Sequence, residues 1–238
     1  MAALAYAQTT DDFSLLVRSG TPQEVQAALD KGADVNAMGR DGLPLIAAAA
    51  FNKNPDVITM LLKAGADTEA RVHGGTALMW AAGFNQNPEV IAALLEAGAD
   101  LNAKDSISGT TALLWAAQNN QNPKVITALL KAGADIEDRD LNGGTALIAA
   151  NSNNPNLEVI IILLNAGADA KAKDNYGWTP LMYAASKTEN PEVIIRLLKA
   201  GADAKAKTNK GYTALDYAKV NESLRGTDAL KRLEEASK

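Results

Sequence analysis

Residues 177–203 read GWTPLMYAASKTENPEVIIRLLKAGAD, and variants of this segment recur along the 238-residue chain. Its final Gly-Ala-Asp triplet occurs six times, at intervals of 33, 33, 35, 34 and 34 residues, ending at Asp34, Asp67, Asp100, Asp135, Asp169 and Asp203. A leucine, mostly within Thr-Pro-Leu or Thr-Ala-Leu, recurs in phase with it at Leu45, Leu78, Leu113, Leu147, Leu181 and Leu215. The shared period indicates an array of structural repeats.

Each repeat is predicted to contain a helix, a turn, a second helix and a loop. Thr179 can cap the first helix with its hydroxyl, as can Thr76, and Pro180 falls at the first helical position, where no N–H is needed. Val193-Ile194 and Leu197-Leu198 form one apolar stripe on the second helix. Gly201 follows the last leucine by three residues, where a left-handed residue ends a helix.

The turn between the two helices carries an Asn-Pro pair in most units. An asparagine N-cap followed by proline is a strong helix start. The pairs are Asn54-Pro55, Asn87-Pro88, Asn122-Pro123 and Asn190-Pro191. In the fourth unit Asn154-Pro155 stands two residues earlier, so we expect a locally different turn there.

These motifs closely resemble the ankyrin repeat over roughly residues 9 to 235. The resemblance implies an all-α solenoid of stacked helix-turn-helix units with protruding β-hairpin-like loops. It divides the chain into an N-terminal capping repeat (8–36), five full repeats (37–205) and a C-terminal capping repeat (206–238), as one continuous domain. The family's histidine after Thr-Pro-Leu is replaced by Ile46, Met79, Leu114, Ile148, Met182 and Asp216. We therefore expect an apolar contact where the family has a polar one.

Composition disfavours catalysis and nucleic-acid binding. The net charge of −5 and the pI near 5.0 argue against a nucleic-acid binder, which usually carries a basic excess. The chain has no cysteine, and its one histidine, His73, falls in a short loop where we expect an exposed tip residue. No apolar run approaches the length that spans a bilayer. We expect no enzyme activity, no cofactor, no metal site and no membrane insertion.

The aromatic residues concentrate on one side of each unit. In ankyrin repeats, partners usually contact the loop tips and the exposed face of the first helix, which line a concave surface. Six of the eleven aromatic residues map to that helix face, Tyr217 among them, and three more lie in the loops. We therefore expect a curved trough lined with rings. The candidate partner-binding residues are Phe51, Trp80, Phe84, Trp115, Asn119, Tyr176, Trp178, Tyr183, Lys187 and Tyr212.

The predicted function is that of a non-catalytic protein–protein interaction scaffold, monomeric, with an unidentified protein bound on the concave face. The alternative is a binder of a small ligand, a sugar or a peptide, in the aromatic groove. Trp80 and Trp115 could equally be packing residues between repeats. Five lysines of the last two loops, Lys171, Lys173, Lys205, Lys207 and Lys210, could attract an acidic partner or simply form a solvated edge.

The expected compartment is the cytoplasm. Ala3-Leu4-Ala5 and Ala5-Tyr6-Ala7 fit a signal-peptidase site, but no basic segment and no apolar core precede them. The alternative is an exported or periplasmic protein whose leader has been removed.

Overall fold

The computed structural model describes residues 10–39, 42–154 and 156–238. The Ala-x-Ala triplets near the N-terminus, together with Tyr6, lie outside these residues. Fourteen α-helices and one short 3-10 helix account for the regular structure of the described part, which contains no named strand.

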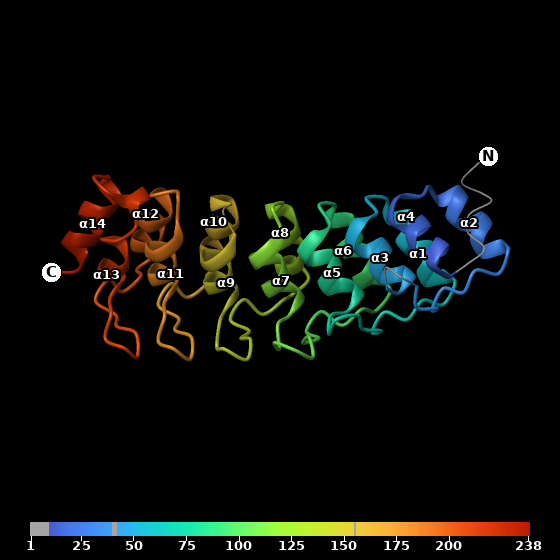
Figure 1. The fold of residues 1–238 in the computed structure, drawn as a ribbon, viewed down its shortest axis with the longest axis horizontal. Helices are drawn as coiled ribbons and strands as arrows, with labels where there is room; N and C mark the ends of the chain where they lie inside the picture. The colour runs from blue at the N-terminus through green and yellow to red at the C-terminus, as the bar shows by residue number, and fades with distance from the viewer. Residues whose placement is uncertain (1–9, 40–41, 155) are drawn as a thin grey trace.

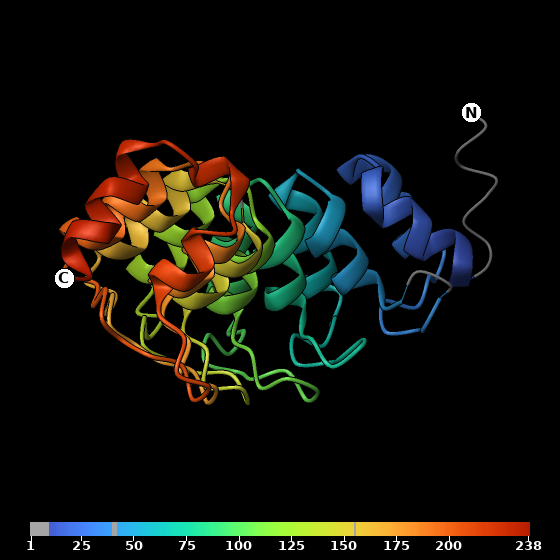
Figure 2. The same cartoon turned by 60° about the vertical axis from the view of Figure 1, so that its left-hand side comes forward.

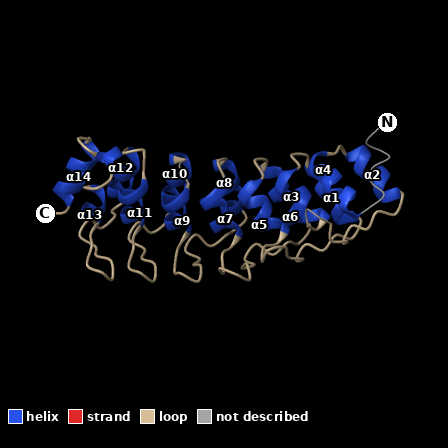
Figure 3. Ribbon diagram, in the orientation of Figure 1, coloured by secondary structure: helices blue, strands red, loops and turns tan. Residues whose placement is uncertain are grey.

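The helices follow one another in pairs along an elongated stack (Figures 1 and 3). They are α1 (Thr10–Ser19), α2 (Pro22–Asp30), α3 (Pro44–Phe51), α4 (Pro55–Lys63), α5 (Ala77–Phe84), α6 (Pro88–Glu96), α7 (Ala112–Asn119), α8 (Pro123–Lys131), α9 (Ala146–Asn153), α10 (Leu157–Asn165), α11 (Pro180–Lys187), α12 (Glu192–Lys199), α13 (Ala214–Ala218), η2 (Glu222–Leu224) and α14 (Asp228–Ala236). Isolated antiparallel bridges join Gly39 to Gly42 and Val72 to Gly75. The predicted all-α repeat fold with hairpin-like loops is confirmed.

In the described part of the chain, the main packing of each helix is with its own partner and with the adjacent units. Each odd-numbered helix contacts the next odd-numbered helix, and each even-numbered helix the next even-numbered one. The first helices bury alanines such as Ala48, Ala81 and Ala116, whose small side chains let neighbouring helices approach closely. The loops project together from the side of the odd-numbered helices (Figure 2). The core is therefore a continuous layer shared by neighbours, which is the packing of a solenoid.

The ends of the second helices form as the sequence predicts. The six glycines of the Gly-Ala-Asp triplets have φ between 87° and 96°. A Cβ atom added to any of them would meet no neighbour within 4 Å. The left-handed backbone alone therefore selects glycine at these positions.

The starts of the helices match the sequence only in part. Asn54, Asn87 and Asn122 cap the second helices by accepting the backbone N–H two residues on. Among the first helices, Thr179 accepts the Met182 N–H as predicted. Thr76 stands at the N-cap, but its buried hydroxyl has no partner, so the predicted cap bond is wrong there. Six of the eight residues of the helix it precedes are buried, and their packing holds the helix instead.

The turn of the fourth unit makes the same hydrogen bonds as its neighbours on both sides of Pro155, which itself lies outside the described residues. Asn156 accepts the N–H of Glu158, as Asn87 accepts that of Glu89. The hydrogen bonds of Asn154 and Asn156 therefore do not show the predicted difference, because they follow the spacing of the asparagines. The proline on which the prediction rested is not among the described residues.

A column of asparagines ties successive units together, and we call it the asparagine ladder. Asn120 is fully buried, and its Nδ2 donates to the carbonyl oxygens of Ala82 and Asn85 in the preceding unit, both at 2.8 Å. Its Oδ1 accepts the N–H of Asn122 at 2.8 Å. The members of the ladder are Asn52, Asn85, Asn120, Asn154 and Asn221. Asn221 reaches this position one residue earlier in its unit, because α13 is shorter than the other first helices.

The positions that replace the family histidine are apolar and buried, apart from the exposed Asp216. Met79, Leu114 and Met182 are at most 1% exposed. They fill the space between units, while the ladder supplies the polar contacts from one unit to the next.

Candidate functional site: the concave face

The rings of the concave face form two clusters and no continuous lining. Trp80, Phe84 and Trp115 make the first, which we call the Trp80 cluster. Trp178, Tyr183, Tyr212 and Tyr217 make the second, the Trp178 cluster. The unit between them presents Ala149, Ser152 and Asn153 from α9. The rings on the predicted trough therefore fall into two groups, because the fourth unit contributes no ring.

The Trp80 cluster combines packing with exposure. The Trp80 ring lies 5.4 Å from both the Phe84 and the Trp115 ring centroids. Each indole N–H is bonded within its own unit: Trp80 donates to the Val72 carbonyl and Trp115 to the Thr110 hydroxyl, both at 3.2 Å. Both tryptophans are half-buried, while Phe84 is 43% exposed. The indoles thus fix their loops against the helices and leave the Phe84 face open to solvent.

The Trp178 cluster is built around a loop tryptophan. The Trp178 ring centroid lies 4.4 Å from that of Tyr217 and 4.8 Å from that of Tyr183. The Tyr183 hydroxyl donates to Asp174 Oδ2 at 2.8 Å. Burial, this hydrogen bond and the charge of Asp174 together raise the pKa of Tyr183, which keeps the phenol protonated. The Lys187 Nζ lies 5.9 Å above the Tyr183 ring.

The remaining candidates stand apart from these clusters or at their margins. Phe51 lies under the guanidinium of Arg18, 4.2 Å from its carbon. Between Phe51 and the Trp80 cluster runs a groove of about 530 Å³ whose lining includes Ile46 and His73. His73 is exposed as predicted, with a left-handed φ of 49°. Asn119 is exposed, but its amide donates to the Trp115 carbonyl of its own helix.

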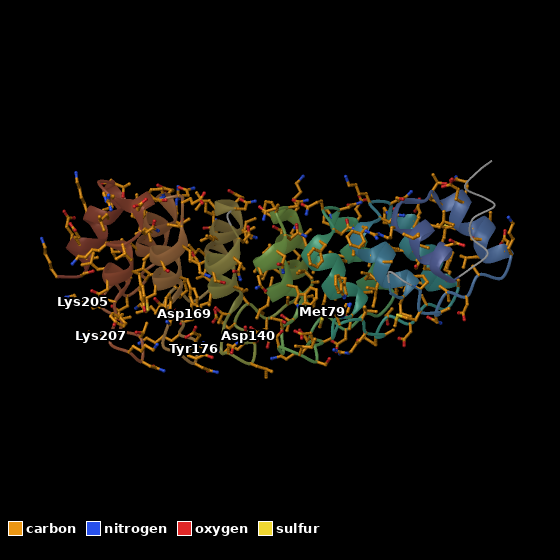
Figure 4. The ribbon with its side chains drawn as sticks, in the orientation of Figure 1. Met79, Asp140, Asp169, Tyr176, Lys205 and Lys207 are labelled. Atoms are coloured by element: carbon orange, nitrogen blue, oxygen red, sulfur yellow. The ribbon has the colours of Figure 1, made fainter. Side chains whose placement is uncertain are left out.

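A small polar pocket separates the two clusters. Its volume is about 270 Å³, and its lining includes Asp140, Asn153, Asp174 and Tyr176. Tyr176 is 60% exposed at a loop tip. Figure 4 shows Asp140 and Tyr176 on the loop side of the stack. Rings therefore lie on both sides of a pocket whose lining includes two carboxylates.

The loops that frame this face are held by internal hydrogen bonds. Asp105 accepts the backbone N–H groups of Ile107, Ser108 and Thr110 and the hydroxyls of Ser108 and Thr110. Burial opposes the charge on this carboxylate, but the hydrogen bonds together outweigh it and hold the pKa of Asp105 well below its usual range. The charged form of Asp105 therefore stabilises the loop between α6 and α7.

We expect Asp105→Asn to destabilise the protein by about 1–3 kcal/mol at neutral pH, because fewer of the five donors keep an acceptor. The folded-state pKa lies below the unfolded value of about 3.9. The stabilisation is therefore complete above that pH and is lost as the pH falls toward the folded pKa. Urea unfolding across pH should show the difference between wild type and variant shrinking below about pH 4. Asp135→Asn, in a one-bond Asx turn, is the control, and an equal difference at low and neutral pH would contradict the assignment.

Sequence reasoning missed three apolar residues at the loop side. Met38, Ile107 and Leu141 are each more than 60% exposed. Leu141 lies over Gly109, whose φ is +69° and where an added Cβ would stand 3.1 Å from the Leu141 Cγ. In the sequence, each of these residues is a single large apolar side chain within an otherwise polar loop, and this pattern could have indicated its exposure.

The lysines of the last two loops form an exposed set. Lys171, Lys173, Lys205 and Lys207 alternate with buried alanines such as Ala172 and Ala206, so they all point away from the stack. Figure 4 shows Lys205 and Lys207 in the loop nearest the C-terminus.

The stacked helix pairs with loops on one side define a helical repeat solenoid of the interaction-domain type. The sequence profile of ankyrin repeats, in sets of three copies, matches residues 13–105, 73–140, 113–208 and 146–235. The chain belongs to the ankyrin repeat family, whose repeats generally mediate protein–protein interaction.

Solved structures agree with this assignment. The ankyrin repeat domain of human ASB11 is similar with a TM-score of 0.80 and 23% identity, over 94% of this chain and 96% of that one. The ankyrin repeat domain of Bcl-3, a member of the IkappaB protein family, has a TM-score of 0.69 and 27% identity, over 92% and 97% of the two chains. A search of curated protein sequences found no significant match. None of the helices in the described part of the chain has the length and apolar character needed to cross a bilayer.

Proposed function

We propose that the protein is a non-catalytic scaffold that binds another protein on its concave face. The observation that carries the proposal is the pair of aromatic clusters: Phe84 is exposed in the first, and Tyr183 of the second lines a polar pocket together with the exposed Tyr176. Exposed aromatic residues in a rigid frame lose little entropy on binding and dominate interface energetics. The loops are part of that frame, because backbone hydrogen bonds join consecutive tips, as from Asn175 N to Asn142 O.

The polar groups of the face favour a protein partner over a sugar. Both indole N–H groups of the Trp80 cluster are bonded to their own loops, and the Tyr183 hydroxyl is bonded to Asp174. A sugar needs many free hydrogen-bond donors and acceptors around the stacking ring, whereas a protein side chain can be held by apolar contact alone. The same internal bonding occupies Asp105 and Asp174, which argues against a role for them as catalytic acids or bases.

We expect Phe84→Ala combined with Tyr176→Ala to weaken partner binding at least tenfold, which corresponds to about 1.4 kcal/mol. Both side chains are exposed, so the melting temperature should change little. The measurement is binding of the partner by calorimetry, with unfolding followed by circular dichroism. Glu96→Ala combined with Lys131→Ala, on α6 and α8, is the matched control. Unchanged binding by the aromatic variant, or an equal loss in the control, would rule out the concave face.

We also propose that the protein acts as a monomer, with the units at residues 8–36 and 206–238 as polar caps of the stack. In the second of these, α14 buries Ala229 and Leu233 against the preceding helices and exposes its charged residues. Such a unit shields the apolar flank of the last full repeat from water.

A further inference from the structure

The asparagine ladder is interrupted at one junction, between the α9–α10 pair and the α11–α12 pair. The residue at the ladder position is Thr188, whose hydroxyl donates to the Asn190 carbonyl at 2.9 Å and accepts the Asn190 N–H at 3.0 Å. Threonine has no amide to reach back to the preceding unit. The carbonyls of Asn151 and Asn154 therefore lack the side-chain donor that Ala117 and Asn120 receive from Asn154.

The turns carry a second tie at other junctions. Asn87, Asn122 and Asn156 each donate from Nδ2 to a carbonyl in the preceding turn, at 2.8, 2.6 and 2.7 Å. The equivalent acceptor for Asn190 is the carbonyl of residue 155, which lies outside the described residues. The loop side of this junction is held, for instance by Arg139 donating to the Lys173 carbonyl, so the interruption concerns the asparagine ladder.

Among the described residues, this junction contains a buried acceptor with no donor. Asn151 stands where the other units have Ala82, Ala117 and Ala185, and the residue is only 7% exposed. Its Nδ2 donates to the Leu147 carbonyl at 2.8 Å, whereas its Oδ1 is buried without a partner. A buried acceptor left unpaired is costly, so a donor that reaches this atom gains a favourable hydrogen bond.

The surrounding cleft has room for that donor. Its volume is about 600 Å³, within the range of roughly 300–1,000 Å³ typical of ligand pockets. Its lining includes Asn151, Asn154, Lys187, Thr188 and Glu189. The amine of Lys187 donates to the Ser152 carbonyl at 3.1 Å, and Glu189 adds an exposed carboxylate.

The groups left without donors are acceptors: Asn151 Oδ1 and the two carbonyls, with the Glu189 carboxylate nearby. At an uninterrupted junction, the planar side-chain NH₂ of Asn120 donates to the equivalent carbonyls, those of Ala82 and Asn85. A planar donor group therefore fits this position. A guanidinium is planar, carries five N–H donors and no acceptor, and is always positively charged. We propose that this cleft is a binding site for a guanidinium group, carried by an arginine side chain of a partner protein. The cleft borders the aromatic face at Ser152, Asn153 and Lys187, but the acceptors that define the site belong to the interrupted junction and not to the rings.

The test is a titration of the full chain, followed by the backbone and side-chain amide signals of residues 151–154 and 187–190 in NMR spectra. The probes are acetyl-Gly-Arg-Gly-amide, the citrulline peptide of the same shape, and methylguanidinium. We expect saturable shifts with the arginine peptide and at least tenfold weaker binding of the citrulline peptide, which is uncharged and replaces a donor by an acceptor. Tighter binding of the peptide than of methylguanidinium assigns the site to an arginine within a chain, and equal binding assigns it to the guanidinium group alone.

Two substitutions make the result specific to the cleft. Thr188→Asn introduces an amide that can donate to the carbonyls of Asn151 and Asn154, as the ladder asparagines do at the other junctions. It should therefore raise the melting temperature and abolish the NMR shifts caused by the arginine peptide. Asn151→Ala restores the residue of the other units and removes the orphan acceptor, and it should weaken binding at least tenfold while the fold is kept. No saturable shift with the arginine peptide, or the same affinity in Thr188→Asn as in wild type, would overturn the proposal.

Discussion

Replacement of Asn120 by alanine should lower the free energy of unfolding by about 3 kcal/mol. The substitution leaves the carbonyls of Ala82 and Asn85 and the N–H of Asn122 without their partners, at a position with no solvent exposure. Each unsatisfied buried group costs about 1–3 kcal/mol. The loss should also spread, because a solenoid is stabilised by the interfaces between adjacent units. Urea unfolding at neutral pH measures it.

Asn119→Ala is the matched control for this change. Asn119 is the adjacent residue, but it is exposed, and its amide bonds only to the Trp115 carbonyl of its own helix. Its substitution should alter the unfolding free energy by about 0.5 kcal/mol or less. Equal effects of the two substitutions would show that the ladder contributes nothing beyond an ordinary side-chain hydrogen bond.

Deletion of residues 211–238 should convert the protein into an aggregating species. It removes α13 and α14, which pack against α11 and α12. The newly exposed flank includes apolar side chains that are buried in the intact stack, and Leu181, Ile194 and Leu197 show no exposure there. An uncovered apolar repeat face is an association site. Light scattering and size-exclusion chromatography measure the outcome.

A single substitution can uncover the apolar flank of the last full repeat without shortening the chain, which separates the two effects of the deletion. Leu233→Asp places a charge at a fully buried position on α14 and should reproduce much of the effect. Glu234→Ala, on the exposed side of the same helix, should leave the protein monomeric. A deletion variant that stays soluble, monomeric and as stable as the full chain would refute the capping role of the last unit.

The local features of the fold were predictable from the sequence because each depends on residues within a few positions of one another. A left-handed glycine such as Gly201 ends its helix through its own φ, and Asn87 caps its helix through an N–H two residues away. The 33- to 35-residue period then required stacking, because one helix pair cannot bury its apolar sides alone. Trp80 and Phe84 are four residues apart, so helix geometry places their rings on one helix face in the same way.

The contacts that distinguish one junction from another were decided only in the tertiary structure. The asparagine at position 120 reads locally as a turn residue, yet its amide bonds lie 35 and 38 residues away in sequence. Whether Trp80 and Trp115 would pack or stay exposed depended on how closely adjacent units approach. The sequence determined the unit and its repetition, and stacking determined which rings touch, which loops lock and where the ladder is broken at Thr188. The physical reason is that these interactions join side chains to backbone groups of a neighbouring unit, and their partners exist only once the units are in register.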